Sequence, residues 1–442
     1  MQNTLYIEII GSMAEKGFSL DELVIRVKEL FETKAMAKVV GLLLSLADEY
    51  LCWNIVRGNK GWRPEACCSH AEYEHKDRLD RRFRTSVGMV EIRWWRLRCR
   101  KCGKTVVPLR EFLGLERFKS KSAELEKMVA EVVSEQSYRR TSRHLDLIGD
   151  IPVPKSTAHR WVMESDCDEL AVDGKAIGIV VADGTGYKRR PDGEKNNRGE
   201  LKVVLGVGSD GTVTPIGAWS GESWEDIGKE IKDNAVNWKK KGKILVSDGE
   251  MGLAEALASI VEQAQRCHWH AAHDVSYKMW EDKAPLDERK AMQCRVAGLI
   301  GIEVPEKDFE RVKEEDKAEL AEKTEKAEKK LDELVSELAG KGYYKAATYV
   351  RNAKENLFSY VRFWLKYGLV CPRAASMIER MMREIGRRLK KIAFGWSEKG
   401  AAKMARIIIK RITSAGEWEN YWNKRLRLNG NVVILLRGVT AK

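Results

Sequence analysis

The sequence predicts a mixed, multidomain protein, in which an α/β core is interrupted by an all-α segment and preceded by smaller modules. The chain has 442 residues, which is more than one compact hydrophobic core normally holds. Short apolar runs alternate with helical patterns between 175 and 275, which is typical of a sheet flanked by helices. From 280 to 370 almost all of the chain follows a helical pattern.

Composition favours a nucleic-acid partner. Apolar residues make up 43% of the chain, enough to bury real cores, so the chain is not disordered overall. Lysine and arginine (79) exceed aspartate and glutamate (66), which gives a net charge of +13. Such a basic balance suits a polyanion, and nucleic acid is the first candidate. A basic protein without such a partner is the alternative.

The N-terminus carries no charged-then-apolar signal segment, and no stretch approaches the roughly 18–20 apolar residues that span a bilayer. We therefore expect a cytoplasmic protein, associated with DNA and not with a membrane. Thiols stay reduced in that compartment, so the paired cysteines among the nine present indicate metal binding more than disulfides.

The first 60 residues are expected to be helical, because two apolar series repeat at helical spacing. They are Leu23, Val24, Val27, Leu30 and Phe31, then Val39, Leu42, Leu43, Leu46 and Ala47. We interpret them as a packing or dimerisation segment. Gly88 and the alternation that follows it at 90–94 then predict a turn and a strand.

Two cysteine-bearing turns predict a metal site. Cys67 and His70 form a Cys-x2-His pair, and Cys99 and Cys102 form a Cys-x2-Cys pair. Two such pairs complete a tetrahedron around Zn²⁺. Because all four positions would be filled by protein, the single ion would be structural. Cys68 could replace Cys67, and coincidental free thiols are the alternative interpretation.

Residues 120–165 are typical of several short helices. Pro154 and Ser156 mark a plausible helix start within a basic segment. Such a helix could enter the major groove of DNA with its first residues on base edges. The candidate contacts are Lys155, His159 and Arg160. An ordinary helical hairpin with solvated basic residues is the alternative.

The alternating region fits the start of a ribonuclease-H-like sheet, in the order β-β-β-α-β-α. The expected strands are 177–182, 201–207, 213–217 and 243–247, and the expected helices are 224–236 and 250–263. Asp183 and Asp248 each follow one of these strands and precede a glycine. Neighbouring strand ends would bring both carboxylates together, where they could hold two divalent cations for phosphodiester chemistry. Simple Asp-Gly turns are the alternative.

A third acid is expected on a basic helix at 376–392. Glu379 and Glu384 lie five residues apart there, which is about 140° around the helix, so both cannot face one site. Basic residues predominate on this helix, and its candidate phosphate contacts are Arg383, Arg387 and Arg388. Two alternatives remain: glutamates paired with arginines on the surface, and a basic helix packed against an acidic segment.

Three other features take a structural interpretation. The mixed Lys and Glu run at 307–333 predicts a solvated helical arm with charge pairs at i,i+4. Cys267 and His270, even with His273, lack an obvious fourth metal ligand. Trp364 is expected to be a core aromatic, and 432–436 is strand-like.

Four short motifs together resemble prokaryotic insertion-sequence DDE transposases of the Mutator-like group. They are Asp183-Gly184-Thr185, Asp248-Gly249-Glu250, Arg266-Cys267-His268-Trp269-His270, and Ile378-Glu379-Arg380 with Glu384-Ile385 and Arg387-Arg388. The resemblance covers about 175–412. It implies a ribonuclease-H-like core with a helical domain inserted between the second aspartate and the glutamate. The cysteine-bearing and helix-turn-helix region resembles the front ends of such proteins, with less specific motifs.

The resemblance implies that Asp183, Asp248 and Glu379 hold two Mg²⁺ or Mn²⁺ ions. Many relatives carry a Thr-Asn pair shortly before the glutamate, where this chain has Ser376-Met377. Glu384 therefore stays an alternative third acid. The implied activity is metal-dependent cleavage at the ends of a mobile element and strand transfer into target DNA. A domesticated, non-catalytic DNA-binding protein and a ribonuclease-H-like nuclease without strand transfer are the alternatives.

The implied partners are double-stranded terminal inverted repeats and target DNA, bound by a homodimer or a larger oligomer. The expected segments, in chain order, are a helical segment 1–60, a zinc-ribbon-like module 61–115, a helix-turn-helix 116–172, the first part of the core 173–280, the inserted helical domain 281–372, the completion of the core 373–415 and a tail 416–442.

Overall fold

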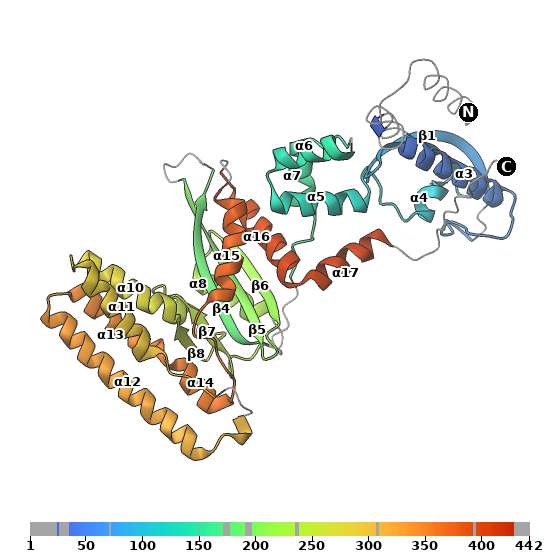
Figure 1. The fold of residues 1–442 in the computed structure, drawn as a ribbon. Helices are drawn as coiled ribbons and strands as arrows, with labels where there is room; N and C mark the ends of the chain where they lie inside the picture. Colours follow the sequence, from blue (N-terminus) through green and yellow to red (C-terminus); the bar gives the residue numbers. More distant parts are fainter. Residues whose placement is uncertain are drawn as a thin grey trace, which may run out of the picture. The chain divides into compact units, whose positions relative to one another are not determined.

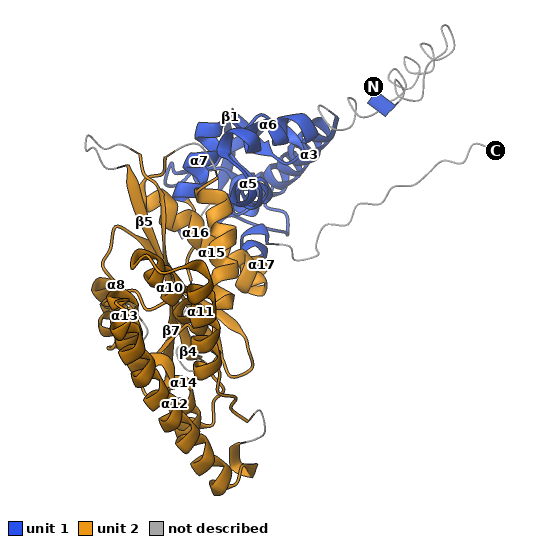
Figure 2. Ribbon diagram, turned by 60° about the vertical axis from the view of Figure 1, so that its left-hand side comes forward, with its two compact units in different colours: residues 1–164, 422–442 blue, residues 165–421 orange. Residues whose placement is uncertain are grey.

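In the computed structural model, the chain divides into two compact units. Unit 1 comprises 1–164 with 422–442, and unit 2 comprises 165–421 (Figure 2). The structure describes residues 24–25, 35–69, 72–149, 151–170, 177–190, 197–234, 238–305, 309–391 and 395–427. His70, the strand-like 432–436 and most of the helix-forming residues before 35 lie outside the described residues. Both units combine helices with a sheet, so the chain is a mixed α/β, multidomain protein.

Unit 1 begins with helix α3 packed on a three-stranded antiparallel sheet. The helix spans Met36–Val56, and the strands are β1 (Tyr73–Thr85), β2 (Gly88–Cys99) and β3 (Thr105–Val106), in the order β1-β2-β3. Val90, Ile92 and Trp94 of β2 are buried under the helix, as their alternation predicts.

Strand β1 was not expected from the sequence, because most of its residues are charged. It is held to β2 by cross-strand ion pairs as well as by the backbone ladder. Arg82 lies 2.7 Å from Glu91, and Arg96 pairs with Asp77. Charged side chains on neighbouring strands thus replace the apolar pattern that usually reveals a strand.

Helix α3 is long and apolar enough, by length and composition alone, to cross a membrane, with a mean hydropathy of 1.5. The expectation that the chain has no such stretch is therefore wrong. A core helix of a soluble protein meets the same test. Here one face of α3 packs on β2 and buries Asp48, whose carboxylate accepts the Trp95 backbone N–H at 2.7 Å.

Four short helices follow in unit 1: α4 (Pro108–Phe112), α5 (Ala123–Glu135), α6 (Tyr138–Gly149) and α7 (Lys155–Glu164), all in Figure 1. The Ser122 hydroxyl caps α5 by accepting the Leu125 N–H at 3.2 Å. Helix α7 begins at Lys155, one residue before the expected start. It buries Ala158, Trp161 and Val162.

Unit 2 is built on a five-stranded sheet in the order β6-β5-β4-β7-β8. The strands are β4 (Ile177–Lys188), β5 (Arg198–Gly208), β6 (Val213–Ser220), β7 (Ile244–Ser247) and β8 (Gln263–Arg266). The pairs β4–β5 and β5–β6 are antiparallel, whereas β4–β7 and β7–β8 are parallel. The four expected strands are confirmed, and helix α8 (Trp224–Asn234) covers most of the range expected for it.

The prediction of a helix at 250–263 is wrong. A short helix α9 (Leu253–Ala256) stands there, and the edge strand β8 begins at Gln263. Gly249 and Gly252 both adopt a positive φ of 83°, which prevents a helix from starting at 250. The polar sequence of β8 concealed the strand. Its buried Gln265 donates to the Leu357 carbonyl at 3.1 Å and accepts the Tyr360 N–H at 2.8 Å.

A layer of five helices, called here the helical layer, follows β8 (Figure 1). They are α10 (His268–Glu281), α11 (Leu286–Ile300), α12 (Glu314–Gly340), α13 (Tyr344–Leu357) and α14 (Ser359–Tyr367). Ion pairs at i,i+4 do occur on α12, as between Lys323 and Glu319 at 2.7 Å. The helix is nevertheless not a free solvated arm, because its other face packs on α13. Trp364 is fully buried, which confirms its core role.

The chain returns from the helical layer to the sheet through helices α15 (Ser376–Leu389) and α16 (Glu398–Thr413), followed by α17 (Ala415–Leu426). Helix α15 packs against β4, and α16 packs against β6. The buried side of α15 carries Ile378, Met382, Ile385 and Leu389, the seam that its 4-3-4 spacing predicts. This arrangement brings the expected third acid back to the strand that carries Asp183.

Candidate active site and cysteine cluster

The register of two parallel strands places Asp183 and Asp248 at the same edge of the sheet. Val181 of β4 pairs with Val246 of β7, and each aspartate follows its valine by two residues. Burial first, and then the negative charge of Asp248, raise the pKa of Asp183 to about 6. The two carboxylates therefore lie near enough to repel one another, as the sequence analysis expects.

Two further carboxylates lie beside this pair. A Cβ atom on Gly184 would meet Glu200 Oε1 at 3.4 Å and Glu250 Oε2 at 3.5 Å. The Glu250 carboxylate accepts the Trp224 indole N–H at 3.3 Å, and burial raises its pKa. Neither residue was predicted from the sequence as a member of the site. Glu250 appeared there only within the motif Asp248-Gly249-Glu250 and was assigned no role.

Glu379 lies in the first turn of α15, beside a cysteine and a histidine from the β8–α10 junction. One ligand atom from each of Glu379, Cys267 and His270 lies within 4.8 Å of the other two. The interaction with Cys267 raises the pKa of His270 despite its burial, and the charge of Asp248 raises it too. His270 in turn lowers the pKa of Asp183. The three expected acids thus share one neighbour, His270.

Glu384 has a different environment from Glu379. Its carboxylate forms an ion pair with Arg387 at 3.1 Å on the same helix. Arg383 and Arg387 are exposed, as expected for a phosphate-binding face. Arg388 is only 2% exposed, and its guanidinium lies 4.6 Å from the centre of the Trp396 ring. Burial thus removes Arg388 from the exposed basic face on which it was expected.

Cys267 joins the strand end that carries Asp248 to the helix that carries Glu379. Its backbone N–H donates to the Ser247 carbonyl at 2.7 Å, and its Sγ accepts the Ala375 N–H at 3.4 Å. The neighbouring His268 N–H donates to the Arg373 carbonyl at 2.8 Å. These three hydrogen bonds fix the first residues of α10 against the segment that leads into α15.

The Cys267 side chain is fully buried. Burial by itself raises the pKa of its thiol, but interactions with His270 and with the Ala375 N–H outweigh this effect. The resulting pKa is lower than that of an ordinary cysteine. In the sequence, Cys267 and His270 were considered as an incomplete metal site and as part of one motif of the family resemblance. The structure adds Glu379 to them, a residue more than a hundred positions downstream.

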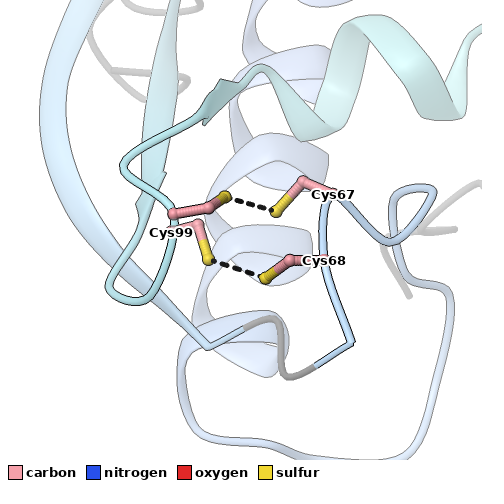
Figure 3. A group of neighbouring side chains, drawn as sticks. Cys67, Cys68 and Cys99 are labelled. Atoms are coloured by element: carbon pink, nitrogen blue, oxygen red, sulfur yellow. Dashed lines mark hydrogen bonds between the residues drawn. The ribbon is translucent and has the colours of Figure 1, made fainter.

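In unit 1 the three cysteines of the expected zinc site, Cys67, Cys99 and Cys102, lie together with Cys68, and Figure 3 labels Cys67, Cys68 and Cys99. Cys102 Sγ lies 3.4 Å from Cys67 Sγ, and Cys68 Sγ lies 3.7 Å from Cys99 Sγ. Four thiolates about 2.3 Å from a tetrahedral zinc ion stand roughly 3.8 Å apart, so this spacing fits the ion. His70, the expected fourth ligand, lies outside the described residues. Cys68, considered only as a substitute for Cys67, joins the group instead.

The electrostatics of this cluster favour thiolate at Cys99. Backbone N–H groups of Cys102 and Lys101 lower the pKa of Cys99 to about 6, although burial opposes them. The Tyr73 hydroxyl donates to Cys67 Sγ at 3.5 Å, but burial and hydrogen bonds with Cys102 and Cys99 outweigh this contact and raise the pKa of Cys67. Because only deprotonated sulfur binds metal tightly, Cys99 is the sulfur best prepared for a soft divalent cation.

Helix α7 presents the expected basic residues unevenly. Lys155 and Arg160 are exposed, and Arg160 lies 3.9 Å from Glu164 on the same helix. His159 is partly buried, with its ring edge-on to Tyr138 at 5.1 Å between centroids. Lys155 and Arg160 are thus accessible to a polyanion, whereas His159 also packs against α6.

No protein-family model matches the chain, and no curated protein matches it. A solved structure, the Drosophila P element transposase strand transfer complex, matches over 73% of this chain and 86% of that chain. The two are 13% identical, with a TM-score of 0.24. A TM-score at this level does not establish a shared fold.

Proposed function

We propose that the chain is a DNA transposase that cleaves DNA at the ends of a mobile element and joins those ends to target DNA. One observation carries the proposal. The parallel pairing of β4 with β7 brings Asp183 and Asp248 to one sheet edge, and α15 returns Glu379 to His270 beside them. Carboxylates from three separate segments of the chain are thereby collected at one place.

The sheet supports a ribonuclease-H-like core within this proposal. Three antiparallel strands, β6-β5-β4, continue into two parallel strands, β7 and β8. Strand β4, the first strand of this sheet in chain order, carries Asp183. Asp248 follows β7, the fourth strand of the sheet in chain order. The helical layer lies in the chain between β8 and α15, where the motif resemblance implies an inserted domain.

In this proposal Asp183, Asp248 and Glu379 would hold two Mg²⁺ or Mn²⁺ ions. The ligands fit, because hard divalent cations prefer carboxylate oxygen, and Asp248 destabilises the charged form of Asp183 in the absence of a cation. Bound metal would supply charge neutralisation at the attacking and leaving oxygens of the phosphodiester. Arg383 and Arg387, exposed on the same helix as Glu379, would orient the phosphate backbone.

The same site would serve two successive reactions. In the first, water attacks the phosphodiester at the element end and leaves a free 3′-hydroxyl. In the second, that hydroxyl attacks a phosphodiester of the target, and one bond forms as another breaks. Neither reaction needs a covalent bond between protein and DNA.

We also propose one structural Zn²⁺ in unit 1, bound by Cys67, Cys68, Cys99 and Cys102. The sulfur spacing supports this set, in which Cys68 takes the place first expected for His70. The ion would tie the loop at Cys67 to the β2–β3 turn. Because protein sulfur fills all four positions, the ion would leave none open for catalysis.

Recognition of the element ends is proposed for α7, with Lys155 and Arg160 as its exposed contacts and His159 between them. A homodimer or a larger oligomer would hold two ends together. In the full chain, Lys155→Ala or Arg160→Ala should weaken binding to the end sequences by roughly 1–3 kcal/mol if the contact is to a base. A phosphate contact would instead weaken binding to all sequences alike.

The decisive test is cleavage by purified protein with Mg²⁺. Asp183→Asn and Asp248→Asn should each abolish strand cleavage and leave DNA binding intact, because each removes charge from the metal site. Asp233→Asn, at an exposed position on α8, is the matched control and should cleave normally. Normal cleavage by either active-site variant would contradict the proposal. Wild-type protein that binds DNA but never cleaves it would favour a domesticated regulator.

A further inference from the structure

Helix α10 exposes a row of aromatic rings, called here the aromatic stripe. It consists of Trp269, His273, Tyr277 and Trp280, spaced by four, four and three residues, so all four lie on one face of the helix. Trp269 is 55% exposed, Tyr277 51% and Trp280 54%. The opposite face of α10 already packs into the unit through Ala271, Ala272, Val275 and Met279. The fold therefore does not need the stripe for its core.

The rings of the stripe are ordered by their contacts with one another. Trp269 and His273 stack with their planes 10° apart and their centroids 4.9 Å apart. Tyr277 and Trp280 lie 5.4 Å apart at 35°. A surface pocket of about 280 Å³ opens beside them, lined by His273, Ser276, Tyr277, Trp280 and Arg289. Flat rings next to a pocket form a surface that suits flat ligands.

Arg289 is the basic residue that favours an anionic ligand beside the stripe. It lines the pocket with a buried Nε that has no hydrogen-bond partner among the described residues. Lys278 Nζ lies 5.6 Å from the centre of the Tyr277 ring, but it forms an ion pair with Glu281 at 2.9 Å, which neutralises both residues. Asp274 accepts a hydrogen bond from Tyr349 at 3.2 Å.

The stripe begins at the candidate active site. Helix α10 starts directly after Cys267, and the ring of Trp269 lies 4.8 Å from the ring of His270. His270 is the shared neighbour of the three acids. A nucleic-acid strand whose phosphodiester reached those acids would thus have aromatic rings next to its bases.

We propose that the aromatic stripe stacks against unpaired nucleobases of the DNA strand beside the scissile phosphate, while Arg289 contacts that strand's backbone. This inference rests on the proposed function. Aromatic side chains stack on any base that presents its face, whereas a base inside a duplex presents only its edge. The stripe therefore gives the site a preference for DNA that is opened at the point of cutting.

The test compares two DNA probes on the full chain. One is a fully paired duplex, and the other has the same sequence with a short unpaired segment that contains 2-aminopurine. Asp183→Asn in every sample prevents cleavage during the measurement. Affinity is measured for both probes, and 2-aminopurine fluorescence, which falls when the base is stacked, reports where the base lies.

The unpaired probe should bind more tightly than the duplex and lose fluorescence on binding. Trp269→Ala and Trp280→Ala should each weaken binding of the unpaired probe by roughly five- to hundredfold, with little change in duplex affinity. Trp269→Phe should retain most of the preference, because it keeps an aromatic face. Trp53→Ala removes a tryptophan that is 47% exposed on α3 and should change neither affinity.

Three results would overturn the inference, and they are distinguishable. Equal affinity for both probes when the stripe is unaltered, or a preference that survives both alanine substitutions, would refute base stacking while leaving the proposed function intact. Failure to bind either probe would refute the proposed function and the inference together. Circular dichroism of each variant checks that lost binding does not reflect lost folding.

Discussion

Replacing Cys267 with alanine tests whether one buried sulfur aligns the second and third acids. The substitution removes the acceptor of the Ala375 N–H and leaves that buried donor unpaired. An unsatisfied buried donor costs about 1–3 kcal/mol, so the free energy of unfolding should fall by about that amount. The backbone hydrogen bond from Cys267 to Ser247 stays, because alanine also has an N–H.

The effect on cleavage should be larger than the effect on stability. Without the sulfur, the segment before α15 loses one of its two hydrogen bonds to the first residues of α10 and keeps the one between His268 and Arg373. We therefore expect Glu379 to shift relative to Asp248. A displacement of about 1 Å in a reacting group can cost roughly a hundredfold in rate. We therefore expect the cleavage rate of Cys267→Ala to fall by about that factor. Cys267→Ser keeps an acceptor at the position and should lose less.

Cys167→Ala is the matched control. Cys167 is also fully buried in unit 2, and its sulfur accepts a hydrogen bond from the Ser165 hydroxyl at 3.0 Å. Its loss should lower stability similarly and leave cleavage unchanged. Urea unfolding and single-turnover cleavage measure the two quantities separately. The reasoning fails if Cys267→Ala cleaves at the wild-type rate, or if both alanine variants lose the same fraction of activity.

Three further predictions follow from the site and the cysteine cluster. Glu379→Gln should be inactive, whereas Glu384→Gln should retain measurable cleavage because Glu384 pairs with Arg387; the reverse outcome would make Glu384 the third acid. Elemental analysis should find one Zn²⁺ per chain, and Cys68→Ser should lose it; folded, DNA-binding wild-type protein without zinc would show that the cluster binds none. In metal-free protein, Asp183→Asn should raise stability at pH 7–8 by up to about 3 kcal/mol, because burial raises the pKa of Asp183 from 3.8 to about 6. The folded state then binds more protons than the unfolded state between those values, so this aspartate costs stability as pH rises through them. The gain should vanish below pH 4, which thermal melts over a pH series would detect; an equal gain at pH 3 and pH 8 would contradict it.

Strands that bury an apolar face could be predicted from the sequence. Strands stabilised by ion pairs or by buried hydrogen bonds could not. Strands β4 and β7 are apolar runs that end in aspartate, and both were expected. Strand β1 depends on ion pairs with β2, which become visible only when the partner strand is known. Strand β8 depends on Gln265, whose partners, Leu357 and Tyr360, lie about ninety residues downstream. Local periodicity carries no information about such distant contacts.

In the candidate site, too, features that depend on local geometry were predictable from the sequence, whereas features that depend on distant contacts were not. The helical angle between Glu379 and Glu384 correctly separated them, because that angle depends only on local geometry. The place of His270 among the acids depends on how α15 returns to β4, which no local pattern encodes. Arg388 was expected among the phosphate contacts because basic residues predominate on this helix, but its position in the 3.6-residue repeat turns it toward Trp396.

The entry and exit of the helical layer are joined by hydrogen bonds from the His268 N–H to the Arg373 carbonyl at 2.8 Å and from the Ala375 N–H to Cys267 Sγ at 3.4 Å. A segment of about a hundred residues therefore begins and ends at neighbouring positions beside the sheet. The cost of closing a loop depends on its ends and only weakly on its length. A layer anchored this way can lengthen, shorten or be exchanged over evolutionary time without moving the carboxylates on either side of it. New surfaces, such as the row of rings on α10, can thus arise next to a fixed reaction centre.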